Sequence, residues 1–137
     1  MSKSIFSEYA AKYYHVSYRT KSGELLEGDF QFKAEVTRRE AFQADSIRRN
    51  VIGPIPQGQD VPPMLQAEAY MIGQLAIHIT DAPEWWLKSE DGLQFSDDGV
   101  VVSVFDKLTE MQQEIKEKLG EKAGSLAANA KAKAEQA

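Results

Sequence analysis

A regular stripe of apolar residues in the last third of the chain constrains the fold more than any other feature. The spacing between successive positions alternates between three and four residues. The positions are Val101, Val104, Leu108, Met111, Ile115 and then either Lys118 or Leu119. A helix with this spacing has one continuous apolar face, of the kind that packs on another element as in a coiled coil. The sequence therefore predicts a helix over residues 99–119 with one covered face. Asp97 and Asp98 precede it, and their carboxylates suit a helix N-terminus.

The first part of the chain predicts a β-hairpin over residues 13–34. Tyr14, Val16 and Tyr18 alternate with polar residues, which is the pattern of a strand with one buried face. The segment 21–24 holds Gly23 and predicts the turn, and Gly28 is a candidate bulge in the second strand. Residues 1–12 are expected to form a short helix or a loose arm.

Two helices and a proline-rich connection are predicted between the hairpin and the final helix. Thr37 and Glu40 form a capping-box pattern, which predicts a helix over residues 36–50. The loop 53–63 holds four of the five prolines, so it is expected to be extended. A second helix is predicted over residues 63–80. Its apolar stripe consists of Leu65, Ala69, Ile72, Leu75 or Ala76, and Ile79.

These elements predict one α+β domain over residues 13–120, in which a hairpin is followed by three main helices packed as a small bundle. Residues 121–137 form an Ala/Lys-rich tail in which seven of seventeen residues are Ala. Ala and Lys favour helix, but a segment with so few large apolar side chains gains little from packing. The tail is expected to be helical or frayed and exposed to solvent.

The residues that most catalytic or metal sites require are scarce. The chain has no Cys and two His, at positions 15 and 78, and neither has another His or Cys at the spacing of metal ligands. The sequence contains no phosphate-binding glycine loop and no nucleophile elbow. The run Asp97-Asp98-Gly99 is interpreted as a helix cap and not as a cation loop, because it lacks the alternating oxygen ligands of an EF-hand. We therefore expect no enzyme activity, no cofactor and no metal.

Charge and hydropathy exclude further classes. The formal net charge is −5, and residues 61–120 hold 11 acidic against 4 basic residues. Basic residues cluster only at Arg38, Arg39, Arg48 and Arg49, which are interpreted mainly as solvated helix charges, so nucleic acid is not an expected partner. No apolar stretch is long enough to cross a bilayer, and the N-terminus lacks a signal-peptide pattern. These features predict a soluble intracellular protein.

Two adjacent tryptophans stand out in the run Pro83-Glu84-Trp85-Trp86. Side chains of neighbouring helical residues point about 100° apart, so one of the two can enter the core while the other stays partly exposed. One interpretation is that both fill the junction between the long helices. The other is that one of them anchors a protein partner, as exposed Trp often does. The second hypothesis predicts a binding surface for a partner or a second copy of the chain, formed by Trp85 or Trp86 with part of the helical stripe, namely Val104, Leu108, Met111 and Ile115.

The order of features resembles a known family. The hairpin pattern from His15 to Phe30, the Pro-containing loop, the run Asp81 to Trp86 and a closing helix that begins Asp-Asp-Gly-Val-Val are similar to small structural-module proteins of tailed bacteriophages. The nearest resemblance, over residues 13–119, is to the tail assembly chaperones encoded ahead of the tape measure protein. It implies a small, acidic, mostly helical, non-enzymatic protein that binds tape measure and tail tube proteins in the host cytoplasm.

Two alternatives remain open at this point. The chain is a permanent virion component of the capsid, connector or tail, or it is a bacterial protein-binding adaptor. Under the virion alternative, the hairpin would extend the sheet of a neighbouring subunit. All three hypotheses place the function in protein contacts.

Overall fold

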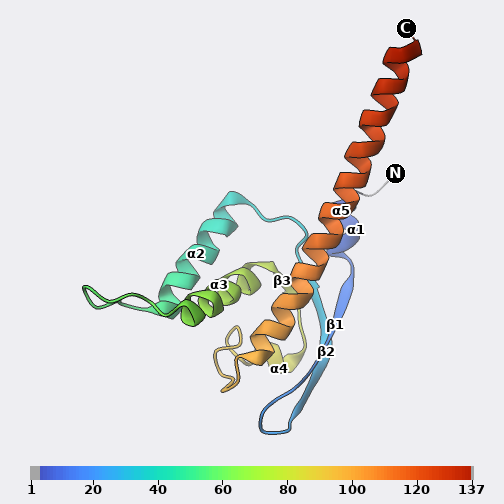
Figure 1. Cartoon of the computed structure of the whole chain (residues 1–137). Helices are drawn as coiled ribbons and strands as arrows, with labels where there is room; N and C mark the ends of the chain where they lie inside the picture. Colours follow the sequence, from blue (N-terminus) through green and yellow to red (C-terminus); the bar gives the residue numbers. More distant parts are fainter. Residues whose placement is uncertain (1–3, 137) are drawn as a thin grey trace.

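The computed structural model describes residues 4–136, with the side chains of residues 4–124 (Figure 1). The elements follow one another as α1 (Ile5–Ala10), β1 (Tyr13–Arg19), β2 (Leu25–Phe32), α2 (Arg38–Ile52), α3 (Pro63–His78), β3 (Ile79–Asp81), α4 (Glu84–Leu87) and α5 (Gly99–Gln136). This arrangement confirms the predicted α+β class with its N-terminal hairpin. In the described part of the chain, no helix combines the length and apolarity that crossing a membrane requires.

The hairpin forms where the sequence predicts it, and β3 extends it into a three-stranded antiparallel sheet in the order β1-β2-β3. Gly23 has φ of +93°, and its N–H donates to the carbonyl of Thr20 over 2.9 Å, which closes the turn. The bulge lies between Gln31 and Phe32 and not at Gly28. A Cβ on Gly28 would lie 2.5 Å from Pro83, so this glycine instead permits close contact with the segment after β3.

β3 is a correction to the predicted helix 63–80, because α3 ends at His78. Ile79 continues the helical spacing, but it also pairs with Phe32 on β2. The backbone of residues 79–81 pairs with β2 there. A strand of three residues is too short to produce a recognisable pattern in the sequence. Thr80 strengthens the junction by donating to the carbonyl of Gln31 over 3.1 Å.

The core lies between one face of the sheet and α5. The sheet contributes Tyr14, Val16, Leu26, Phe30 and Phe32, all buried. The apolar stripe of α5 covers them, and α1 packs on the same core through Tyr9, with Ile5 and Phe6 half-buried. The segment 1–12 therefore holds a docked helix, α1, and is not a loose arm; residues 1–3 of that segment lie outside the described residues.

α2 and α3 form a helical hairpin beside α5, on the side of the sheet where β3 lies (Figure 1). The predicted capping box is present: Thr37 Oγ1 accepts from the Glu40 N–H, and the Glu40 carboxylate accepts from the Thr37 N–H over 3.0 Å. Gly73 allows the two helices to approach closely, because a Cβ there would lie 2.5 Å from the Ala44 carbonyl oxygen.

α5 begins at a buried carboxylate. Asp97 accepts from Tyr18 Oη over 2.9 Å and from the backbone N–H groups of Gly99 and Lys21 over 2.9 and 3.1 Å. These donors, with the Gly99 N–H foremost, hold the pKa of Asp97 below its usual value. The same carboxylate thus joins the hairpin turn to the start of α5.

The predicted helix 99–119 and the tail 121–137 form one continuous helix as far as Gln136, with residue 137 outside the described part. Ile115 is its last buried residue among those whose side chains are described. Beyond that point the helix projects away from the core (Figure 1). The tail is therefore helical; the sequence alone leaves open whether it is helical or frayed.

Candidate interaction surface

The two tryptophans lie in an aromatic cluster at the sheet. Trp86 is 2% exposed, and its ring centroid lies 5.7 Å from that of Phe30. Trp85 is half-buried, packs on Phe30 and Phe95 at 5.7 and 6.1 Å, and donates from Nε1 to the Glu27 carbonyl over 2.8 Å. Both side chains therefore take part in internal packing, against β2 and, through Phe95, the loop before α5; these contacts are not at the junction between the long helices that one interpretation proposed.

The predicted stripe on the last helix also faces inward. Val104, Leu108 and Met111 are fully buried, and Ile115 is 5% exposed. The exposed partner surface predicted from these residues is therefore corrected: in this conformation Trp86 and all four stripe residues are core. The reason is that the apolar face of the sheet needs a cover, and α5 of the same chain supplies it.

A different apolar surface is exposed on α3. This helix contains a single charged residue, Glu68, so it is apolar or uncharged around almost its whole circumference. A helix of that kind is usually buried on all sides. Here, however, Met64 is 78% exposed and Tyr70 is 51% exposed.

We define the α3 flank as Met64, Ala67, Tyr70, Met71 and Gln74. At about 100° per residue, these positions fall within roughly a third of the helix circumference. Ala67 is exposed, whereas Met71 and Gln74 are half-buried. The Tyr70 ring meets that of Phe105 at 6.2 Å, which joins the flank to α5 near the exposed Val102. The flank is therefore an uncharged surface on α3 that meets α5 at the Tyr70–Phe105 contact.

Sequence reasoning missed the α3 flank, although a signal for it was present. The stripe predicted for this helix contains its buried Ala69, Ile72 and Leu75, and one stripe was enough to predict a packed helix. Met64, Ala67, Met71 and Gln74 form a second set, also with spacings of three and four. Two such stripes with one charged residue between them indicate a helix that is covered on more than one side.

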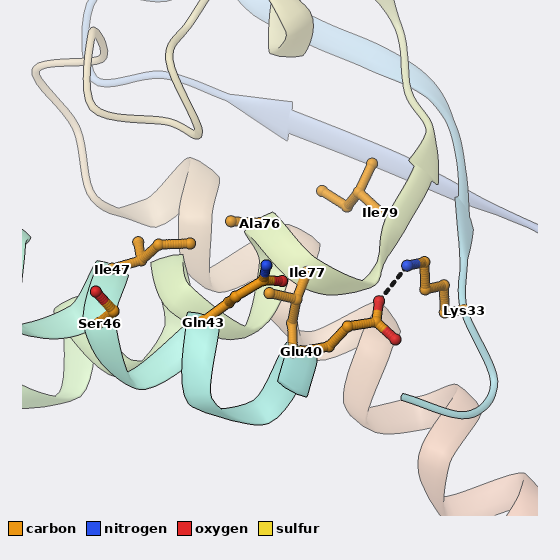
Figure 2. A pocket seen from close by; sticks show the side chains of 8 residues that line it. All are labelled: Lys33, Glu40, Gln43, Ser46, Ile47, Ala76, Ile77 and Ile79. Carbon is orange, nitrogen blue, oxygen red and sulfur yellow. Dashed lines mark hydrogen bonds and ion pairs between the residues drawn. The ribbon is translucent and has the colours of Figure 1, made fainter. Parts of the chain in front are cut away.

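A shallow cleft of about 450 Å³ lies between α2, the end of α3 and the exit of β2 (Figure 2). Its apolar wall includes Ile47, Ile77 and Ile79, and its polar wall includes Gln43 and Ser46. Lys33 and Glu40 form an ion pair at one end, drawn as a dashed line in Figure 2.

The ionisable groups near this cleft are committed to structural contacts. The Lys33 ammonium and the Thr37 N–H lower the pKa of Glu40 to about 2, so its carboxylate is charged and engaged. His78 is buried, which lowers its pKa, and its Nδ1 lies 2.7 Å from the Gln74 carbonyl. Because a carbonyl only accepts, Nδ1 carries the proton. The groups of the cleft that remain available for contact are therefore apolar side chains, the amide of Gln43 and the hydroxyl of Ser46.

The other histidine lies on the solvent face of β1. His15 Nδ1 is 2.9 Å from the Asp29 carboxylate, and this contact raises the pKa of the imidazole. The basic cluster on α2 is also partly neutralised, because Arg48 and Arg49 both pair with Asp45. Among the described residues, no group of three His, Asp or Glu side chains is placed to hold a metal ion.

Comparison of the chain with protein-family models, with curated proteins and with solved structures found no match.

Proposed function

We propose that this chain is a non-enzymatic bacteriophage morphogenesis protein, similar to tail assembly chaperones, and that the α3 flank is its partner-binding surface. The expected partners are the tape measure and tail tube proteins, met in the host cytoplasm during assembly. The observation that carries the proposal is the exposure of an uncharged helix face: Met64, Ala67 and Tyr70 are all open to solvent.

The chemistry of the flank suits an apolar helical partner. Methionine side chains are flexible and polarizable, so they adapt to partners of different shape. Tyrosine presents a large ring with few rotatable bonds, and it is enriched at protein interfaces. A helix that lays its apolar side on such a surface uses the helix-in-groove mode of recognition.

Co-purification with the tape measure and tail tube proteins of the same phage tests the proposal. The substitutions Met64→Glu and Ala67→Glu place a charge on the flank without removing any core contact, and each should abolish or strongly weaken co-purification. Phe42→Glu is the matched control, because Phe42 is 68% exposed on the outer face of α2 and lies outside the flank. Equal binding by all three variants would exclude the α3 flank as the interface.

The protein content of purified virions tests the assembly role separately. A chaperone should be absent from virions or scarce in them. Copies in a fixed stoichiometric ratio to the tail tube subunit would instead establish a permanent virion component.

A further inference from the structure

The structure points to a second interaction surface, the free edge of β1: we propose that two copies of this chain pair there, β1 against β1 in antiparallel orientation, to form a dimer with a continuous six-stranded sheet. This inference concerns the sheet and does not depend on the α3 flank or on a phage role.

The direction of the backbone groups in β1 follows from the turn. The Thr20 N–H donates to the Glu24 carbonyl over 2.8 Å, so this pair is hydrogen-bonded across the hairpin. Hydrogen-bonded and non-hydrogen-bonded pairs alternate along an antiparallel ladder. Arg19, Ser17, His15 and Tyr13 therefore occupy non-hydrogen-bonded pairs, and their N–H and C=O groups point away from β2.

Contacts on the other side of the hairpin agree with this alternation. Glu27 pairs with Ser17, and its carbonyl accepts from the Trp85 indole; Gln31 pairs with Tyr13, and its carbonyl accepts from Thr80. Both carbonyls thus point away from β1, as the alternation requires. On β1, no hydrogen bond to the corresponding backbone groups occurs within the described part of the chain.

The two edges of the hairpin differ: the β2 edge is covered by other parts of the chain, whereas the β1 edge is open. β3 pairs with one end of the β2 edge, and Pro83 and Trp85 cover the rest. Soluble proteins usually protect an edge strand with proline, a bulge, outward charges or a short length. β1 has seven residues with no proline, no glycine and no register shift.

The polar side chains of β1 also leave its edge open, because they turn back over their own chain. Tyr13 Oη donates to Asp81 over 2.8 Å, His15 contacts Asp29 at 2.9 Å, and Ser17 Oγ donates to Glu27 over 3.2 Å. Arg19 donates to the carbonyl of Gly23 in the turn over 2.9 Å. The edge therefore presents backbone groups without a protruding charge.

A second copy is the occupant that fits this edge, because the strand is complementary to itself. Antiparallel pairing about a two-fold axis at Val16 overlaps all seven residues and places outward-facing backbone groups opposite one another. In this register Tyr13 lies opposite Arg19 of the second copy, which favours a cation–π contact, and His15 lies opposite Ser17. No two like charges face each other, and the contacts to Asp29 and Glu27 are retained.

Such a dimer would place the two α2–α3 hairpins far apart. Each hairpin adjoins β3, whereas the pairing occurs at β1 on the opposite edge of the sheet (Figure 1). Both copies of the α3 flank would stay exposed, one at each end of the extended sheet.

Sedimentation of the purified chain is the first part of the test, and it should show a dimer. Ser17→Pro removes an N–H that points away from β2, so it should leave the hairpin intact and yield a monomer with an unchanged circular dichroism spectrum. Ser17→Ala keeps that N–H and should remain dimeric. A monomeric wild-type chain, or a dimeric Ser17→Pro variant, would overturn the proposal.

Cysteine cross-linking provides a second test that needs no proline, because the native chain has no Cys. A mixture of His15→Cys and Ser17→Cys chains should form a disulfide-linked heterodimer under mild oxidation, since these positions face each other. Neither variant alone should cross-link efficiently, and a mixture of His15→Cys with Glu27→Cys should not either, because Glu27 lies one strand further in. Equal yields in all samples would exclude this register and with it the proposed interface.

Discussion

At the scale of single residues, close contacts decide which positions tolerate change. Glycine and tryptophan mark the tightest places: Gly73 lies against the backbone of α2, and Trp86 lies against Phe30 and Trp85. Neither residue contributes a polar function there. The space around each position determines which side chain fits. A pattern of polar and apolar residues carries little information about that space.

Substitution of Gly73 by Ala should destabilise the chain. The new methyl group would lie 2.5 Å from a backbone carbonyl, and backbone cannot move aside as a side chain can. The expected loss in the free energy of unfolding is about 1–3 kcal/mol, measured by denaturant titration. Gly120→Ala is the matched control, because it has open space around it and should stabilise α5 by up to about 1 kcal/mol. Similar effects of both substitutions would contradict the close packing of α2 on α3.

Substitution of Trp86 by Ala should show that the tryptophan pair is structural. Removal of a fully buried Trp side chain typically costs about 3–5 kcal/mol in the free energy of unfolding. The neighbouring Leu87 is 67% exposed, and Leu87→Ala should change the free energy of unfolding by about 0.5 kcal/mol or less. A stable Trp86→Ala variant that has lost partner binding would restore the anchor hypothesis.

At the scale of elements, the helices and strands with clear local signals were predictable. Period-two alternation predicted β1, the capping box predicted the start of α2, and the apolar stripe predicted the part of α5 that covers the sheet. β3 was not predictable, because its three residues gain their conformation from pairing with β2. The sequence also could not show which partner covers the stripe of α5, since an apolar face is the same whether its cover comes from the same chain or from another.

The ion pair between Lys33 and Glu40, at the start of α2, stabilises the fold by an amount that depends on pH. The pKa of Glu40 falls from an ordinary 4.5 to about 2 in the folded chain, so its stabilising effect is complete above pH 4.5. That effect is lost as the pH falls through about 2. Glu40→Gln keeps the capping box but removes the ion pair. The variant should therefore be less stable than the wild type at neutral pH, and the difference should shrink on acidification.

Unfolding titrations of the wild type and Glu40→Gln at several pH values measure this difference. Lys33→Met should cost the wild type stability but add little to the cost in the Glu40→Gln background, because the ion pair is already broken there. A difference that stays constant with pH, or fully additive costs, would show that the pair does not stabilise α2.

At the scale of the whole molecule, the structure separates what holds the chain together from what it offers to others. The core uses the sheet, α5 and the aromatic cluster, and it includes most of the residues that the sequence suggested for partner binding. Among the surfaces outside the core, the two to which we assign partners are the α3 flank and the edge of β1. The flank was missed because one stripe already accounted for a packed helix, and the open edge depends on strand order, which a single hairpin pattern does not define.

The measurement that tests the proposed function most directly is a titration of the methionine methyl groups with the tape measure protein, followed by nuclear magnetic resonance. The side chains of Met64 and Met71 belong to the α3 flank, whereas Met111 is fully buried in the core and serves as the internal control. Binding at the flank predicts that the signals of Met64 and Met71 shift or broaden while that of Met111 stays in place. No change at Met64 and Met71 when the partner binds, or no binding at all, would contradict the proposal.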